Sequence, residues 1–350
     1  MTNSNWLIYG ANGYTGELIA REAVKRGSRP ILAGRNREQV GALAAELKLE
    51  GRIAALDDRA ALEAMLQDVA VVAHCAGPFS HTAKPMIDAC LRTRTHYLDI
   101  TGEIAVFEAA AARDLEAQAA GVMLLPGAGF DVVPTDCTAA YLKAQLPTAT
   151  HLALAFRGLG RTSRGTTLTA LEGMTNNGMI RHNGQLTPVP SGWKTRTVDF
   201  GDGPRATVTI PWGDVSTAFY STHIPNIVVY TAFPGVLIGL LKVSRVVNPL
   251  LSLPPVQALL RRAVRAMPPG PTAAQRERSR SQVWGEVRDA AGHTATVRLT
   301  MTGGYPLTVL TTLDIVQRVL GGHAPIGFQT PSRAYGHELI FGIEGVQQVG

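Results

Sequence analysis

The chain has 350 residues, of which 45% are hydrophobic and 17% are charged. This composition excludes an intrinsically disordered, collagen-like or small disulfide-rich protein, and the length is sufficient for two domains. The net charge is only +6 and lysines do not cluster, so we expect no nucleic-acid partner. Cys75, Cys90 and Cys137 are too few and too far apart for a disulfide framework, and the N-terminus does not resemble a secretion signal. These features predict a cytoplasmic protein.

A regular alternation of segments runs through residues 1–146. Short aliphatic runs alternate with longer segments rich in alanine and leucine, which is typical of a parallel sheet wound with crossover helices. The predicted strands are residues 6–9, 30–33, 52–56, 69–75, 96–100 and 122–125. The predicted helices are residues 14–26, 37–47, 59–67, 84–92 and 106–119. Six strands in this rhythm predict a Rossmann domain.

The pattern changes after residue 147. The next predicted strands are residues 151–156, 194–200, 206–212, 281–288 and 294–301. Turn sequences without helices separate several of them, which indicates a mixed or antiparallel sheet. We therefore predict an α/β fold, with a doubly wound parallel Rossmann sheet in residues 1–146 and a second, α+β domain built on a mixed sheet in residues 147–310. Residues 311–350 begin with a predicted helix over 311–320 and form a C-terminal helical segment that could return to the Rossmann domain.

A glycine-rich turn stands where the first predicted strand ends and the first helix begins. Its sequence, Gly-Ala-Asn-Gly-Tyr-Thr-Gly over residues 10–16, has G-x-x-G-x-x-G spacing. Glycines allow a tight turn and a close approach of the backbone to a pyrophosphate, toward which helix amides point. The candidate cofactor-binding residues here are Gly10, Asn12, Gly13, Tyr14, Thr15 and Gly16. The alternative is an ordinary glycine-rich turn between a strand and a helix.

The second predicted strand ends at a basic residue. The sequence there is Gly-Arg-Asn-Arg at residues 34–37, without the carboxylate that would bind a ribose 2′-hydroxyl in an NAD enzyme. Because a guanidinium can pair with a 2′-phosphate, Arg35, with Asn36 beside it, predicts NADP(H) as the cofactor. The alternative for Arg35, and for Arg37, is a solvated charge at a helix start. Asp57 is a candidate for the adenine amino group or, alternatively, a helix cap.

Three further loops are expected at the same edge of the sheet. The cofactor candidates after the fourth predicted strand are Ala76, Gly77, Pro78 and Phe79. Glu103 and Asp131 follow the fifth and sixth strands and bring carboxyl groups toward a common crevice, although each could instead cap the helix that follows it. His74, inside the fourth strand, is expected to be a hydrogen-bonded core residue rather than a ligand.

Together these segments resemble the saccharopine dehydrogenase-like superfamily, and within it the trans-acting enoyl reductases. The resemblance rests on residues 10–16, Ala-Gly-Arg at 33–35, Ala-Gly-Pro-Phe at 76–79, His-Tyr-Leu-Asp-Ile-Thr-Gly-Glu at 96–103 and Gly-Phe-Asp-Val-Val-Pro-Thr-Asp at 129–136. It extends to Ser-Arg-Gly-Thr at 163–166 and is thin after residue 179. It implies a Rossmann domain, a mixed-sheet second domain and an NADP-linked reduction. It assigns the cofactor role to Gly10, Gly13, Gly16, Arg35 and Gly77, and it identifies no catalytic residue, because the superfamily acts on several kinds of bond.

These observations predict an NADPH-dependent oxidoreductase that delivers hydride to an apolar unsaturated substrate, such as an enoyl or polyketide-like compound, free or bound to a carrier. The enolate formed in such a reduction needs hydrogen-bond donors and then a proton. The candidate donors are Ser163 and Thr166, and the candidate proton relays are Asp131 and Glu103. No Tyr-x-x-x-Lys, H-E-x-x-H, C-x-x-C or P-loop motif occurs, so we expect no metal site.

Two other functions stay open. An amino-acid or imine dehydrogenase of the saccharopine dehydrogenase type would require an arginine that binds a substrate carboxylate, for which Arg157, Arg161 and Arg164 are candidates. A non-catalytic Rossmann protein associated with a lipid surface is the other alternative.

The second half of the chain contains an apolar stretch followed by a basic one. Residues 215–241 contain no Asp, Glu, Lys or Arg, and neither do residues 246–260. Residues 256–288 then carry seven arginines against two glutamates. This order suits an anionic membrane, so we predict peripheral contact of residues 215–265 with the inner face of a membrane. The alternative is that residues 215–260 form ordinary core or a buried homodimer interface.

Overall fold

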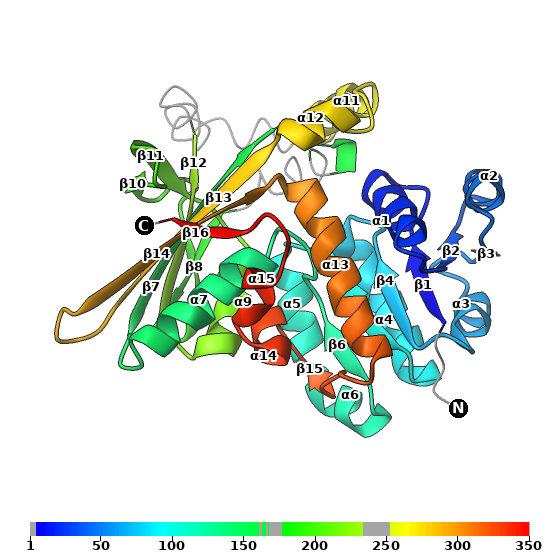
Figure 1. Ribbon diagram of the computed structural model, residues 1–350, viewed down its shortest axis with the longest axis horizontal. Helices are drawn as coiled ribbons and strands as arrows, with labels where there is room; N and C mark the ends of the chain where they lie inside the picture. Colours follow the sequence, from blue (N-terminus) through cyan, green and yellow to red (C-terminus); the bar gives the residue numbers. More distant parts are fainter. Residues whose placement is uncertain (1–4, 161–162, 166, 168–176, 234–252, 350) are drawn as a thin grey trace. The chain divides into compact units, whose positions relative to one another are not determined.

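The chain folds into two compact units, which the computed structural model describes over residues 5–160, 163–165, 167, 177–233 and 253–349 (Figure 1). Unit 1 comprises Met1–Val133 and Tyr305–Ala334, and unit 2 comprises Pro134–Gly304 and Tyr335–Gly350. Each unit is built around one sheet.

Unit 1 contains a parallel sheet. Its described strands are β1 (Trp6–Tyr9), β2 (Ile31–Gly34), β3 (Gly51–Ile53), β4 (Val71–His74), β5 (His96–Asp99), β6 (Met123–Leu125) and β15 (Gly327–Phe328). They lie in the order β15-β6-β5-β4-β1-β2-β3, and the neighbouring pairs are parallel. β1, β2 and β4 are buried along their whole length, as expected for central strands whose two faces are covered by helices. The predicted Rossmann sheet is confirmed.

Helices connect these strands. In unit 1 they are α1 (Tyr14–Lys25), α2 (Arg37–Leu47), α3 (Arg59–Leu66), α4 (Phe79–Thr93), α5 (Ile104–Ala111), α6 (Asp114–Ala120), α13 (Gly304–Leu320) and α14 (Pro331–Tyr335). The chain runs from β1 outward to β3 and then crosses to β4 on the other side of β1. A ligand crevice in an open α/β sheet lies at such a reversal, outside the carboxyl ends of the strands. The fold therefore places the loops after β1 and β4 at the centre of any nucleotide site.

A late part of the chain completes the sheet of unit 1. β15 pairs with β6, and the Thr311 hydroxyl of α13 donates to the Ala128 carbonyl oxygen at 2.8 Å. Residues 311–350 were expected to act as one helical segment. The structure instead divides them, because Tyr335–Gly350, which includes a strand, belongs to unit 2.

Unit 2 contains a mixed sheet, as predicted. Its described strands are β7 (His151–Leu159), β8 (Gly178–His182), β9 (Gln185–Val189), β10 (Thr195–Asp199), β11 (Pro204–Thr209), β12 (Asn226–Ala232), β13 (Arg280–Arg288), β14 (Thr294–Thr302) and β16 (Gln347–Val349). Its described helices are α7 (Val133–Gln145), α9 (Asp214–Thr222), α11 (Pro254–Arg265), α12 (Ala273–Arg278) and α15 (Glu338–Phe341). The main strand order is β10-β11-β12-β7-β13-β14-β16, in which β12 and β7 are parallel and the other pairs antiparallel.

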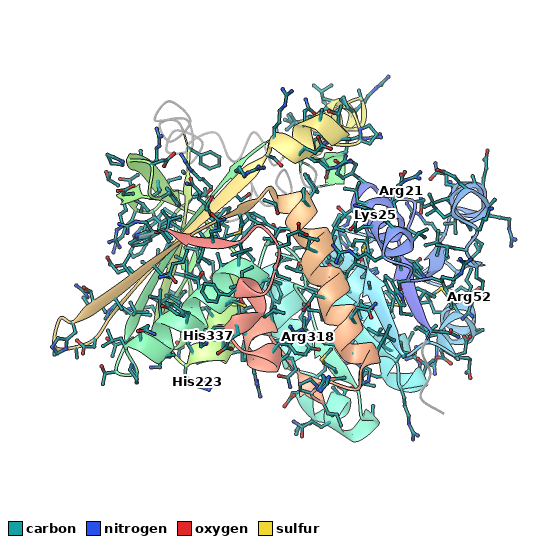
Figure 2. All side chains as sticks on the ribbon, in the orientation of Figure 1. Arg21, Lys25, Arg52, His223, Arg318 and His337 are labelled. Carbon is teal, nitrogen blue, oxygen red and sulfur yellow. The ribbon has the colours of Figure 1, made fainter. Side chains whose placement is uncertain are left out.

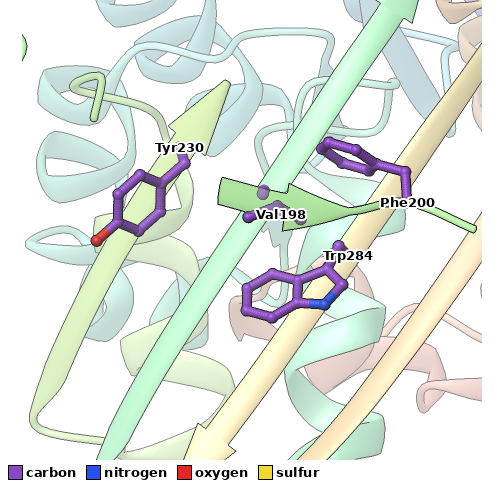
Figure 3. Packing of buried hydrophobic residues seen from close by; sticks show 5 residues of the cluster. Val198, Phe200, Tyr230 and Trp284 are labelled. Atoms are coloured by element: carbon purple, nitrogen blue, oxygen red, sulfur yellow. The ribbon is translucent and has the colours of Figure 1, made fainter. Parts of the chain in front are cut away.

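A cluster of buried hydrophobic side chains lies on this second sheet (Figure 3). Its members are Ala155, Val198, Phe200, Tyr230 and Trp284. Arg196 covers the cluster, since its Cζ atom lies 4.5 Å from the centre of the Trp284 ring. The same guanidinium pairs with Glu286 at 2.9 Å, so its charge is neutralised at the edge of the apolar cluster.

Helix α7 packs on the sheet of unit 2. A Cβ atom added to Gly285 of β13 would lie 2.6 Å from Thr138 Cγ2 and 2.7 Å from Leu142 Cδ1, so the helix sits directly on the strand. The first segment of unit 1 consequently ends at Val133 rather than at residue 146, where the sequence pattern places the boundary. The sequence pattern changes at the strand that follows α7, whereas the spatial division comes before this helix.

The first described part of the apolar stretch, residues 215–232, is largely core. Helix α9 and strand β12 carry it from residue 214 to 232, and Val215, Ala218, Ile227 and Val229 are fully buried. β12 lies inside the sheet between β11 and β7, which accounts for its lack of charged residues. Neither α9 nor the β8–β9 hairpin is among the predicted elements. Residues 234–252 lie outside the described residues, and no described helix is both long and apolar enough to cross a bilayer.

We expect the contact between α7 and β13 to tolerate no side chain at residue 285. Substitution Gly285→Ala should lower the free energy of unfolding by about 1–3 kcal/mol, because Thr138 and Leu142 would have to move. Gly158→Ala is the matched control, since Gly158 lies in the neighbouring strand β7 and a Cβ atom there meets nothing within 4 Å. Chemical denaturation of both variants measures the difference, and equal unfolding midpoints would contradict this packing.

Candidate functional site

The glycine-rich turn forms a tight cradle between β1 and α1. Gly10 has a φ angle of +82°, and a Cβ atom there would lie 2.9 Å from the backbone nitrogen of Ala76. A Cβ atom on Gly16 would overlap with the Gly10 carbonyl oxygen. The loops after β1 and β4 therefore approach at backbone contact, and larger residues would separate them. Gly13 starts α1 without a side-chain cap, which leaves the first amides of the helix in the arrangement that binds phosphate.

The other predicted residues of this turn have separate surroundings. Asn12 Nδ2 donates to Gln39 Oε1 at 2.7 Å, so Asn12 braces the turn against α2. The Tyr14 ring meets the Tyr305 ring edge-on, with centroids 5.0 Å apart. Thr15 is partly buried in the first turn of α1. The side-chain amide nitrogen of Asn12 is therefore already hydrogen-bonded within the protein.

Arg35 is an exposed cation at the carboxyl end of β2. Among the described residues it has no salt-bridge partner, whereas Arg21 and Arg52, labelled in Figure 2, each pair with carboxylates. The charges of Arg35 and Asp57 both act on the Tyr9 hydroxyl, which donates to the Ala54 carbonyl oxygen at 2.9 Å. Burial of this tyrosine raises its pKa.

Asn36 and Asp58 cap the two helices that follow β2 and β3. Asn36 Oδ1 accepts from the Gln39 amide at 3.0 Å, so Asn36, predicted to bind cofactor, caps α2. Asp57 is exposed and does not cap α3, because Asp58 accepts from the Ala61 amide at 3.0 Å. The alternative function of Asp57 as a cap is therefore wrong.

The turn before α4 is closed by a carboxylate from another loop. Glu103 accepts from the backbone amides of Phe79 and Ser80, each at 2.8 Å. Glu103 therefore caps α4, which precedes it in the chain, rather than the helix that follows it. Both of its oxygens are occupied by these amides, which leaves it poorly suited to relay a proton. Ala76, Gly77 and Pro78 form the turn itself, and Phe79 is buried.

His74 lies fully buried at the end of β4. Its Nε2 atom is 3.1 Å from Thr82 Oγ1, and that hydroxyl donates to the Ala76 carbonyl oxygen at 2.6 Å. Nδ1 has no partner among the described residues, so the expected core histidine is only half satisfied. Burial lowers the pKa of His74 to about 3, which keeps it neutral. Its ring stands edge-on to Phe79, with centroids 5.4 Å apart.

Asp99 ties two loops together, a task that the sequence pattern does not assign to this acid. Its Oδ1 accepts from the amides of Thr101 and Gly127 at 2.9 and 2.8 Å, and its Oδ2 accepts from the Tyr97 hydroxyl at 2.6 Å. Burial raises the pKa of Asp99 to about 6 despite these hydrogen bonds. The available signal was an acidic residue closing a buried strand, two positions after a tyrosine.

Asp131 lies on the loop that Asp99 holds. A Cβ atom on Gly102 would be 3.1 Å from Asp131 Oδ2, so the loops after β5 and β6 are in contact. The Phe130 amide donates to Thr308 Oγ1 of α13 at 3.0 Å, which fixes the backbone beside Asp131. Burial raises the pKa of Asp131 to about 7. An acid with this pKa can be protonated or ionised near neutral pH, as a proton donor requires.

The remaining predicted residues belong to unit 2. Ser163 is buried, and its carbonyl oxygen accepts from the Thr167 amide at 2.9 Å. Thr166 and Arg161 lie outside the described residues. Arg157 pairs with Asp202 and donates to Gln282, so its charge is already compensated within the unit. No group of three or more His, Cys, Asp or Glu side chains in the described ranges is arranged to bind a metal ion.

Comparison with known proteins agrees with this geometry. Residues 6–125 match the family described as saccharopine dehydrogenase NADP binding domain. A saccharopine dehydrogenase-like oxidoreductase from Bos taurus is 27% identical over 222 residues, covering 56% of this chain and 46% of that protein. A trans-acting enoyl reductase from Mycobacterium leprae is 34% identical over 140 residues, covering 37% of this chain and 33% of that protein. The matches thus span less than half the length of these curated relatives.

A solved structure extends the likeness to the whole chain. The saccharopine dehydrogenase (L-Glu forming) of Saccharomyces cerevisiae has a TM-score of 0.65, covers 99% of this chain and 100% of its own, and is 14% identical. At this identity the likeness concerns the fold, which is an α/β fold with a parallel Rossmann sheet and a second mixed sheet. The sequence matches and the fold agree on one assignment. Residues 6–125 carry an NAD(P)-binding domain of the saccharopine dehydrogenase type, and the chain as a whole is similar to saccharopine dehydrogenase-like proteins in its fold.

Proposed function

We propose that the protein is an NADPH-dependent oxidoreductase that reduces an apolar, unsaturated substrate of the enoyl or polyketide-like class, free or carrier-bound. The observation that carries the choice of NADPH is Arg35, exposed and unpaired by any described residue where an NAD enzyme has a carboxylate. A carboxylate would repel a 2′-phosphate, whereas a guanidinium offers it two parallel hydrogen bonds. The match to enoyl reductases supports the substrate class.

The residues at the β1–β4 reversal fit a dinucleotide. The first amides of α1 would hold the pyrophosphate, because Gly10, Gly13 and Gly16 keep side chains out of the cradle. Arg35 would hold the 2′-phosphate. Gly77, which has no side chain, would let a nicotinamide ring approach the backbone after β4. When bound, the reduced nicotinamide supplies a hydride.

Asp131 is the acid best suited to deliver the proton that completes such a reduction. After hydride reaches the β-carbon, the α-carbon must take up a proton. Glu103 has both oxygens bound to the amides of α4, and Asp99 has its two oxygens bound to three donors. Asp131 combines a pKa of about 7 with a loop that Asp99 and Thr308 hold in place.

A second candidate is reduction of an imine, which the fold likeness to yeast saccharopine dehydrogenase favours. This reaction would require a cation that binds the substrate carboxylate. The charge of Arg157 is compensated by Asp202, so this arginine is poorly suited to bind a substrate carboxylate. We therefore place the unsaturated apolar substrate first.

Arg35 gives the test of the cofactor. Titration of the wild type should show tighter binding of NADPH than of NADH. Substitution Arg35→Asp should weaken NADPH binding by about 10- to 100-fold, the loss of one or two charge-assisted hydrogen bonds, and leave NADH binding unchanged or improved. Arg37→Asp is the matched control, since Arg37 is exposed two residues later and should not alter the preference. An unchanged cofactor preference in Arg35→Asp would refute the assignment of NADPH. A wild-type protein that binds neither nucleotide would refute the proposed oxidoreductase activity.

Asp131 gives the test of the proton donor. NADPH oxidation measured with a panel of enones, imines and oxo-acids identifies the class of substrate that the protein reduces. The rate of this reduction should fall as pH rises through about 7, because Asp131 donates only when protonated. Substitution Asp131→Asn should lower the rate roughly 100-fold or more and remove this pH dependence. Glu103→Gln should keep the pH dependence and lower the stability by about 0.5–2 kcal/mol, as loss of a helix cap does. If Asp131→Asn retained the wild-type rate and profile, another group would have to be the donor.

A further inference from the structure

An apolar stripe remains exposed on unit 2 after its core is accounted for. Leu253, Leu259 and Met267 are 45%, 69% and 41% exposed, and they lie at the start, in the middle and just past the end of α11. Single exposed apolar residues are common, but three on one short element form a patch. This differs from residues 214–232, whose apolar side chains are largely buried in the unit.

Helix α11 has apolar residues on two adjoining faces. Val264 is buried and Leu260 partly buried, so this face packs against the protein. Leu259, Ala263 and Met267 are spaced by four residues and therefore line up along the neighbouring face, and all three are exposed. The turn continues to Met267, since its amide donates to the Val264 carbonyl oxygen at 3.1 Å. We call this row of Leu259, Ala263 and Met267 the α11 stripe.

Positive charge surrounds the α11 stripe. Residues 253–280 contain six arginines and a single acid, Glu277, and so carry +5 of the chain's net charge of +6. The side chains of Arg262, Arg278 and Arg280 are exposed, and within the described ranges none of them has a salt-bridge partner. This contrasts with the arginines of α1 and of the β3 region, which are paired.

We propose that the α11 stripe docks onto an anionic lipid surface. Leu259 and its neighbours in the stripe would enter the boundary between headgroups and acyl chains, and the unpaired arginines would bind the headgroup phosphates. The helix has 12 residues, which suits a position parallel to the surface. A second copy of the chain is a less suitable occupant, because a symmetric dimer would place the exposed arginines of this segment against themselves.

Vesicle binding by the full chain tests this docking. The protein should co-sediment with vesicles of phosphatidylcholine and phosphatidylglycerol at low salt, and much less with pure phosphatidylcholine or at high salt. Substitution Leu259→Glu should weaken binding about tenfold or more, because a carboxylate would enter the apolar boundary and face the anionic headgroups. Arg262→Glu should weaken binding and also reduce its dependence on salt. Circular dichroism and thermal melting should be unchanged in both variants, since both side chains are exposed.

Leu115→Glu is the matched control. Leu115 is 79% exposed on α6 of unit 1, so the substitution adds the same charge at an exposed leucine elsewhere, and vesicle binding should equal that of the wild type. Absence of binding to anionic vesicles at low salt would overturn the proposal, and so would equal weakening by Leu259→Glu and Leu115→Glu. Sedimentation velocity without lipid tests whether a second copy of the chain binds the α11 stripe. A dimer that Leu259→Glu converts to a monomer would show that the α11 stripe is an interface between copies instead.

Discussion

The nucleotide-binding unit depends on backbone contact between the turn after β1 and the turn after β4. Gly10 lies against Ala76, and Gly16 lies against the carbonyl of Gly10, with no room for a Cβ atom at either glycine. The contact occurs where the strand order reverses, so it brings the start of α1 to the centre of the sheet edge. The other residues proposed to bind the cofactor or transfer a proton, from Arg35 to Asp131, lie along that edge of the sheet.

Three acids from neighbouring loops show how surroundings divide similar groups among different tasks. Glu103 accepts hydrogen bonds from the amides that begin α4. Asp99 accepts hydrogen bonds from a tyrosine hydroxyl and two loop amides. Asp131 follows the loop that Asp99 organises, and burial shifts its pKa toward neutrality. Hydrogen bonds to backbone amides thus fix the positions of Glu103 and Asp99, and burial sets the pKa of Asp131.

The sequence pattern predicts the parallel sheet and the glycine turn because both depend on local order: the alternation of strands and helices, and the spacing of glycines. The cap that Asn36 forms is also local, because it accepts from an amide three residues later, but the task of Glu103 depends on which amides lie nearby in space. Glu103 reaches back across a loop to a helix that starts 24 residues earlier, and no local spacing reports this. The β8–β9 hairpin and α9 were missed, and the boundary at Val133 was displaced, because periodicity does not show which sheet a helix such as α7 will cover.

The nucleotide-binding unit is discontinuous in the chain, and this affects how it can be made. β6 obtains its outer neighbour only from β15, which lies about 200 residues later. During synthesis on the ribosome, the first six strands emerge while that edge is still open, and the whole of unit 2 except its last residues is translated before the edge closes. A fragment ending at residue 146 would keep an unpaired strand edge and lack the helix that supports the Asp131 loop, so the site cannot be isolated by cutting the chain at the end of its first six strands.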